Sequence, residues 1–192
     1  MQMSFVERRP FLWVLFLAGI ALAAAVANAT TFAPLSFDRL AQQSSAVARL
    51  RCLSSAGAWD GGEIWTTTQF AVVELRKGTL GATISVRTLG GRVGNLHSRV
   101  DGVPAFRAGE EVYLFLWGQA GEPYRVLGWS QGTFRIVHDA GSGMEKVTQE
   151  SSGNNFDARD RQFHGDAIRG MGMRAFQEKL RVALERHTSA EH

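Results

Sequence analysis

The chain has almost no cysteine, since Cys52 is the only one in 192 residues. One thiol cannot form an intramolecular disulfide, which excludes a scaffold held by disulfides. The thiol is then buried and inert, reactive, or half of an intermolecular bridge. Because Cys52 alternates with Arg49 and Arg51 in a segment of period two, we expect its side chain to face a core.

Metal-binding motifs are also lacking. The five histidines form neither an H-E-x-x-H motif nor an i, i+4 pair, so the sequence predicts no zinc site and no cofactor. Asp157, Asp160 and Asp166, with Asn154 and Asn155 nearby, carry the oxygen ligands that calcium takes, but they lack the spacing of an EF-hand. We interpret them as solvated acids of a loop.

No long run of like charges is present. The 21 lysines and arginines are mostly single arginines scattered among 18 acidic residues, and the formal net charge is +3. Proteins that bind nucleic acid carry a basic patch or stripe, so this pattern argues against a nucleic-acid partner.

Only one long hydrophobic run occurs, over residues 11–26, and it follows Arg8 and Arg9 closely. Ala27-Asn28-Ala29 comes next, with the small-x-small form of a signal-peptidase site. A membrane anchor is the alternative, but this run is shorter than the roughly 20 residues that span a bilayer. The sequence therefore predicts a cleaved signal peptide over residues 1–29, an exported protein of the periplasm or the extracellular space, and no membrane span after cleavage.

Cleavage after residue 29 of 192 leaves 163 residues, enough for one domain with its own core. We expect a β-barrel or sandwich domain over residues 30–138, a polar, glycine-rich segment over 139–172 and a closing helix over 173–187. That helix carries an apolar stripe, which predicts packing on the sheet; docking of a partner on the stripe is the alternative. The stripe consists of Met173, Phe176, Leu180, Ala183 and Leu184.

Alternating and β-branched segments predict several short antiparallel strands, preceded by one helix over residues 37–43 with Ser36 as its cap. The expected strands are 46–54, 63–75, 80–87, 112–117, 124–129, 133–137 and 144–147. The expected connections are a turn or loop over 55–62, a hairpin turn over 77–79, a long loop with one short pairing segment over 89–103, and a second hairpin turn over 130–132. Because no long helices alternate with the strands, the pattern favours an antiparallel barrel or sandwich over an α/β fold.

Residues 128–132 read G-W-S-Q-G and satisfy G-x-S-x-G, the nucleophile elbow of α/β-hydrolases. An elbow needs a helix after the serine, whereas the residues that follow here have a strand pattern. A glycine-flanked hairpin turn is therefore the favoured interpretation, and a small secreted serine hydrolase that uses Ser130 is the alternative. The Ser, Asp, His order would be completed by Asp157 or Asp166 and by His164 or His187.

The candidate binding residues are Trp59, Trp65 and Arg92. Tryptophans on an exported β-domain can form protein or sugar contacts, and the alternative is that they belong to the core. We expect Trp65 to be the most exposed, because it lies on the strand face opposite Ile64, and Trp59 to be the next. Arg92 stands in a glycine loop over residues 90–94 whose amides offer an anion site; a structural turn is the favoured interpretation.

Four segments together resemble uncharacterised secreted bacterial β-proteins: residues 64–66, residues 70–78 with their closing Lys-Gly, residues 84–87, and residues 109–116 with their opening Gly-Glu-Glu. More distantly, residues 44–137 are similar to the netrin-like domains of tissue inhibitors of metalloproteases, which are OB-type barrels. The resemblance implies an OB-like barrel and a binding module for a secreted protease or envelope protein. Those inhibitors are disulfide-rich and chelate the catalytic zinc through an N-terminal cysteine. Residue 30 is a threonine here and Cys52 stands alone, so only the barrel carries over.

Three hypotheses about function follow. The first is an exported, non-enzymatic binding module of unknown ligand, with a secreted protease or an envelope protein as its partner. The second is the serine hydrolase described above. The third is a structural component of the cell envelope.

Overall fold

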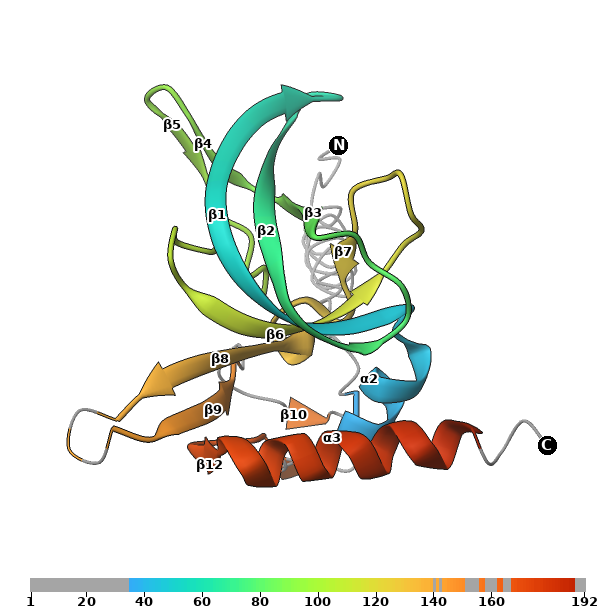
Figure 1. The fold of residues 1–192 in the computed structure, drawn as a ribbon. Helices are drawn as coiled ribbons and strands as arrows, with labels where there is room; N and C mark the ends of the chain where they lie inside the picture. The colour runs from blue at the N-terminus through green and yellow to red at the C-terminus, as the bar shows by residue number, and fades with distance from the viewer. Residues whose placement is uncertain are drawn as a thin grey trace, which may run out of the picture. The chain divides into compact units, whose positions relative to one another are not determined.

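The computed structural model describes residues 35–139, 141, 143–150, 156–157, 162–163 and 167–188. The expected signal peptide over residues 1–29 lies outside these residues. The side chains of Asp157, Asp160 and Asp166, which we expect to be solvated, are likewise not among those described. The described part is mainly β, with an antiparallel sheet and a C-terminal helix, as the sequence predicts (Figure 1). Within it, no helix combines the length and the apolarity that crossing a membrane requires.

The helices are α2 (Phe37–Gln43), the short 3-10 helix η1 (Trp129–Gly132) and α3 (Met173–Thr188). The longer strands are β1 (Ala46–Asp60), β2 (Glu63–Lys77), β3 (Thr83–Leu89), β6 (Glu111–Trp117), β8 (Thr133–His138) and β9 (Glu145–Gln149). The shorter strands are β4 (Gly91–Val93), β5 (Leu96–Ser98), β7 (Arg125–Val126), β10 (Phe156–Asp157), β11 (Gln162–Phe163) and β12 (Met171–Gly172).

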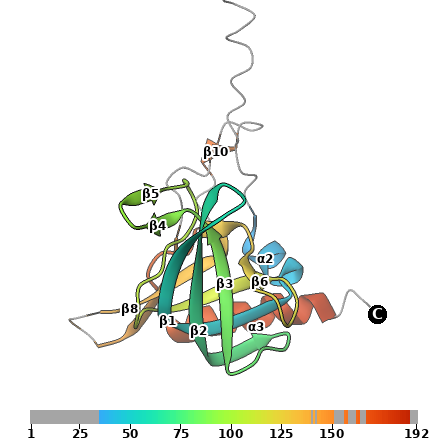
Figure 2. The same ribbon diagram turned by 90° about the horizontal axis from the view of Figure 1, so that it is seen from above.

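Five strands curl into a partly open barrel, the arrangement typical of an OB-type fold. β1 pairs with β2 on one side and β6 on the other, β2 pairs with β3, and β6 pairs with β7. β3 and β7 have no continuous ladder between them and are joined through one parallel bridge between Val86 and Tyr124. Figures 1 and 2 show how strongly β1 and β2 bend to make this curvature.

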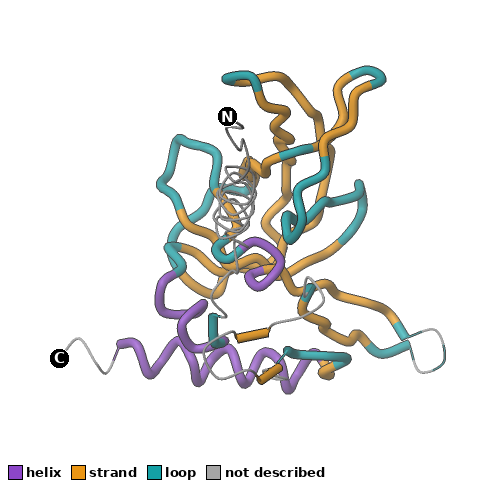
Figure 3. The backbone as a smooth tube through the Cα atoms, turned by 180° about the vertical axis from the view of Figure 1, so that it is seen from behind, coloured by secondary structure: helices purple, strands orange, loops and turns teal. Residues whose placement is uncertain are grey.

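β6 is the strand that the two cores share. Val112, Leu114 and Leu116 face the interior of the barrel, whereas Tyr113 and Phe115 face a second core under α2 and α3. β8, β9 and β12 extend the sheet beyond β6, and both helices cover one face of this extension (Figure 3). The predicted strand over residues 112–117 is therefore confirmed, and residues 112–116 are buried on both faces of the sheet.

The helices pack as their apolar patterns predict. The Ser36 hydroxyl caps α2 by accepting from the Arg39 amide at 3.2 Å, and α2 has the predicted bounds. In α3, Phe176, Leu180 and Ala183 are fully buried in the second core, while the other two stripe residues are partly buried there. Burial of each large side chain contributes about 1.5–3 kcal/mol, so α3 closes the fold on itself.

Two predicted connections are wrong. Residues 55–60 are not a turn but the second half of β1, which pairs with β2 as far as Asp60, across a bulge between Cys52 and Ser54. The turn is confined to Gly61 and Gly62, where φ is 59° and 84°. The second predicted hairpin is also absent, because β7 and β8 both pair with β6 and not with each other. β1 occupies one edge of β6, so β7 and β8 pair with different parts of the other edge, and η1 carries the chain between them.

The hairpin of β2 and β3 and the short pair within the loop of residues 89–103 are as predicted. The pair consists of β4 and β5, which project beside the tip of the β1–β2 hairpin (Figure 1). This projecting pair forms one wall of the largest cavity described below.

Candidate functional site

A cleft of about 610 Å³ opens between the β4–β5 hairpin, strands β2 and β3, and the segment of residues 99–107. Its volume lies within the range of roughly 300–1,000 Å³ that small-molecule sites occupy. Threonines of β2 and β3 line one side, and Glu110, Arg135 and Glu150 line the other. The cleft is therefore polar on both sides.

The β4–β5 hairpin is held in place by close contacts between backbones. The amide of Gly90 donates to the Ile64 carbonyl at 2.7 Å, and the Thr66 hydroxyl donates to the Gly90 carbonyl at 2.7 Å. On the other side, a Cβ atom at Gly57 would lie 2.3 Å from the Arg92 carbonyl oxygen. Gly57 is therefore required where β4 crosses β1, and the wall of the cleft depends on it.

The bulge in β1 anchors the opposite wall. The Ser55 and Thr68 hydroxyls are hydrogen bonded at 2.8 Å, and the Cys52 amide donates to the Glu110 carbonyl at 2.9 Å. The Phe106 ring packs edge to face on Phe70, with ring centroids 5.1 Å apart. Residues 104–110 are thereby fixed to the barrel, and the chain on both sides of the cleft is ordered by packing.

Arg135 is the charged centre of the cleft. Its guanidinium pairs with Glu110 and, at 2.6 Å, with Glu150, and it donates to the Ala105 carbonyl at 2.9 Å. Burial raises the pKa of Glu150 above its ordinary value of 4.5 although Arg135 lowers it, and the charge of Glu110 adds to the rise. One arginine thus holds together two carboxylates and a loop carbonyl.

Two further arginines at the cleft keep their charge available. Arg99 and Arg107 line the cavity with exposed side chains. Neither guanidinium forms a hydrogen bond or ion pair with another described residue, whereas Arg135 is surrounded by acids. Three arginines stand against two glutamates, so the cleft favours a negatively charged occupant.

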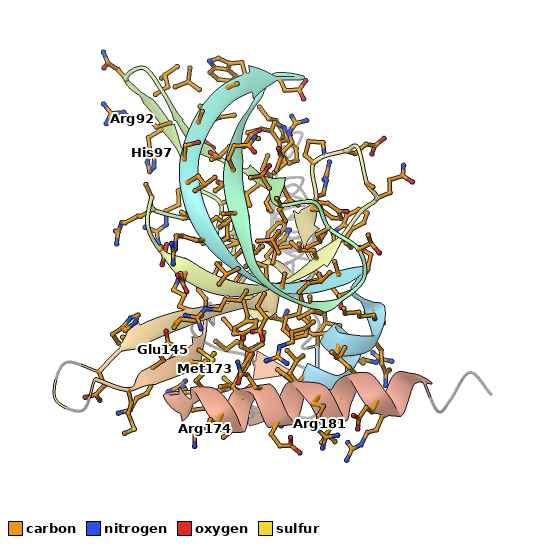
Figure 4. All side chains as sticks on the ribbon, viewed as in Figure 1. Arg92, His97, Glu145, Met173, Arg174 and Arg181 are labelled. Atoms are coloured by element: carbon orange, nitrogen blue, oxygen red, sulfur yellow. The ribbon has the colours of Figure 1, made fainter. Side chains whose placement is uncertain are left out.

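Two of the three predicted binding residues lie at this end of the barrel. Trp59 is 54% exposed on the β1–β2 hairpin, two residues after Gly57. Arg92 lies on β4 opposite His97 (Figure 4), and its Nε donates to the Gly94 carbonyl at 2.9 Å. The interpretation of residues 90–94 as a structural turn holds only for Gly94, because residues 91–93 form strand β4 and pair with β5.

The predicted order of exposure among the tryptophans is wrong. Trp65 is only partly exposed, because the guanidinium of Arg87 stacks 4.5 Å from its ring and that of Arg125 stacks 5.1 Å away. Trp59 and Trp117 are more exposed. Arginine stacking across strands cannot be read from the alternation of one strand, which is why the sequence misplaced Trp65.

Ser130 lies in η1, and the backbone there is not that of a nucleophile elbow. The left-handed residues are Gly128 and Trp129, with φ of 64° and 54°, and the serine itself is 4% exposed. Its amide donates to the Gly102 carbonyl at 2.9 Å. An elbow places a strained, accessible serine before a helix, whereas β8 follows here. The side chains proposed to complete a triad lie outside the described part.

The glycines and the glutamine of the same motif have packing roles. A Cβ atom at Gly132 would lie 2.1 Å from the Leu127 carbonyl oxygen. Gln131 accepts from the Leu35 amide through Oε1 and from the Gln149 side chain through its carbonyl, both at 2.6 Å. The motif therefore ties β9 and the start of the described chain to η1.

Cys52 is buried, as predicted, at 2% exposure. Burial raises the pKa of its thiol, although Ser55 lowers it. Among the described side chains, no three acids, histidines or cysteines gather closely enough to hold a metal ion.

The charged residues of the cleft were missed by sequence reasoning. They come from segments far apart in the chain, and only the pairing of β6 with β8 and of β8 with β9 brings Glu110, Arg135 and Glu150 together. The one available signal was the long loop of residues 89–103, which the sequence marked as unusual.

Comparison with protein-family models, with curated proteins and with solved structures gives no match. The resemblance to netrin-like domains stays a prediction.

Proposed function

We propose that this protein is an exported, non-enzymatic binding module that holds an acidic, extended segment of a secreted protease or envelope protein in the cleft beside Arg99 and Arg107. The observation that carries the proposal is that no described residue neutralises the charge of these two arginines at a cavity of about 610 Å³. Interfaces use such charges to select partners and to speed association.

The lining of the cleft suits a peptide chain. Thr66, Thr68, Thr88 and the β4–β5 hairpin line the cavity. The Thr66 and Thr68 hydroxyls are already hydrogen bonded to Gly90 and Ser55, so the backbone of the hairpin is the part of the lining that would pair with peptide amides and carbonyls. An acidic side chain on the incoming segment would meet Arg99 or Arg107. Arg135 is already engaged with two carboxylates, so its role is to shape the cleft.

The hairpin tips next to the cleft supply apolar contact area. Trp59 and Leu96 are 54% and 59% exposed on two hairpins that lie side by side. Exposed tryptophans at the edge of a pocket are frequent energetic centres of protein interfaces. A partner held by its acidic segment would cover these two side chains.

Site-specific photo-crosslinking tests this proposal. A photoreactive phenylalanine analogue replaces Ala105, which is exposed and lines the cleft, or Ala120, which is exposed in the loop between β6 and β7. In the cells that export the protein, we expect one discrete crosslinked product from position 105 and none from position 120. Arg99→Glu together with Arg107→Glu is expected to reduce that product by about tenfold or more.

Equal crosslinking from both positions, or a product at position 105 that survives the two charge reversals, would contradict binding in the cleft. A structural envelope protein would give several products from both positions. Circular dichroism of the doubly reversed variant, compared with the parent, checks that the exposed substitutions leave the fold intact.

A further inference from the structure

A second cluster of aromatic and cationic side chains covers the outside of the barrel where β3 meets β7. The Arg125 guanidinium stacks 5.1 Å from the ring of Trp65 and 5.8 Å from that of Trp117. Arg125 and Trp117 are directly paired across β6 and β7. We call the place where β3 meets β7 the seam. The cation therefore lies between two indoles that come from opposite sides of this seam.

The two arginines of this cluster differ in how their charge is balanced. Arg87, which stacks on the other part of Trp65, forms an ion pair with Asp60. Arg125 forms neither a hydrogen bond nor an ion pair with any described residue. A guanidinium has five N–H donors in a planar fork. None of those of Arg125 is used by a described residue, so its N–H groups can donate to a ligand.

A small cavity of about 100 Å³ adjoins Arg125. It is lined by the side chains of the cluster, including Trp129, and by Leu89 and Val103, which also line the cleft from the other side. The cavity has room for a group the size of a carboxylate. Trp117 beside it is 49% exposed, so a ring attached to that carboxylate has an indole face to lie on.

Packing of the seam alone would explain part of this arrangement. Trp65 and the neutralised Arg87 cover the short β7 strand, and stacking of an exposed arginine on an indole is favourable by itself. Packing does not require a second arginine that no described residue neutralises, nor an indole left 49% exposed next to a cavity. These two features are what a ligand would satisfy.

We propose that Trp65, Arg125 and Trp117 form a binding site for a carboxylate carried on a ring. The carboxylate accepts two hydrogen bonds from the donor edge of Arg125, in the bidentate geometry that guanidinium groups favour. The ring lies on the exposed face of Trp117. A sugar acid of a polysaccharide and a small aromatic acid share this chemistry.

Two-dimensional NMR of the purified protein, read at the indole N–H signals, tests the site. Trp59 serves as an internal control, because it lies on the β1–β2 hairpin tip and takes no part in the stack. Glucuronate and benzoate at millimolar concentration are the two carboxylate probes, and glucose and inorganic phosphate are the controls. We expect the Trp65 and Trp117 signals to shift with at least one carboxylate, at a Kd of about 1 mM or tighter, while Trp59 does not move.

The variant Arg125→Gln is expected to raise this Kd about tenfold or more, because it removes the charged donor. Arg174→Gln, on the exposed face of α3 (Figure 4), is the matched control and should leave the Kd unchanged. A response to glucuronate alone identifies the sugar-acid source, and a response to benzoate alone identifies the aromatic one. Equal shifts with glucose or phosphate, no shift with either carboxylate, or an unchanged Kd in Arg125→Gln would each overturn the proposal.

Discussion

Tyr124 and Val86 form the only bridge between β3 and β7 in the described chain. The Tyr124 amide donates to the Ser85 carbonyl and its carbonyl accepts from the Arg87 amide, both at 2.8 Å. The Tyr124 side chain is buried in the core of the barrel. The contact between β3 and the start of β7 thus depends on one residue that contributes both backbone pairing and core packing.

Tyr124→Ala tests this dependence. We expect the free energy of unfolding to fall by about 3 kcal/mol, because a buried aromatic ring is lost at the seam. Urea unfolding followed by circular dichroism measures the change. Tyr124→Phe keeps the ring and should remain within about 0.5 kcal/mol of the parent. Similar losses in both variants would mean that the hydroxyl, and not the ring, matters.

Gly57→Ala tests the crossing of β4 over β1. The added Cβ atom would lie 2.3 Å from the Arg92 carbonyl oxygen, so the β4–β5 hairpin must move away from β1. Overpacking of this kind costs about 1–3 kcal/mol, and we expect faster amide hydrogen exchange in residues 91–98. Gly81→Ala is the matched control, since its nearest contact is an ordinary 3.5 Å. Unchanged exchange in Gly57→Ala would show that the hairpin tolerates the methyl group.

Local patterns predicted the elements whose neighbours are close in sequence. The alternation of β3, the two apolar faces of β6 and the stripe of α3 each follow from the period of one segment. The prediction for residues 55–60 was wrong because Gly57 lies in a glycine-rich stretch whose composition is typical of a turn. Its real constraint is the Arg92 carbonyl, 35 positions away in the chain.

The candidate site was harder to predict for the same reason. Trp59 and Arg92 were found because tryptophans and glycine loops stand out in a sequence. Glu110, Arg135 and Glu150 do not, since charged residues are common on surfaces and only the register Val112 to Arg135 brings the arginine beside the acids. The stack on Trp65 likewise needs the pairing of β6 with β7, which the sequence did not predict.

Glu111→Gln tests the ion pairs across β1, β6 and β9. Glu111 accepts from Arg49 at 2.7 Å and from Arg51 at 2.8 Å. Burial raises the pKa of Glu111, but the hydrogen bonds from Arg51 and Arg49 outweigh it and hold the pKa below the ordinary value of 4.5. Loss of this carboxylate should cost about 1–3 kcal/mol at neutral pH, measured by urea unfolding.

The loss of stability in Glu111→Gln should also depend on pH. A carboxylate whose pKa is lower in the folded state stabilises the fold above its unfolded pKa and loses that contribution as the pH falls through the folded value. The difference between parent and Glu111→Gln should therefore be constant from pH 7 to about 4.5 and shrink below it. Glu122→Gln, in the exposed loop between β6 and β7, is the matched control and should leave the stability at pH 7 unchanged. A difference that grows on acidification would reverse the assigned role.

Cys52 provides the last test, because its burial decides between the three states open to a lone thiol. At 2% exposure and with its pKa raised by burial, the thiol is neither accessible nor ionised at neutral pH. We expect labelling by Ellman's reagent to be about 100-fold slower or more in the native protein than in urea, since it requires opening of β1. Ser54→Cys in a Cys52→Ala background places a thiol at an exposed neighbouring position and should react at once. A disulfide-linked dimer on a non-reducing gel of native protein would contradict the buried state, because β1 would have to open for that bond to form.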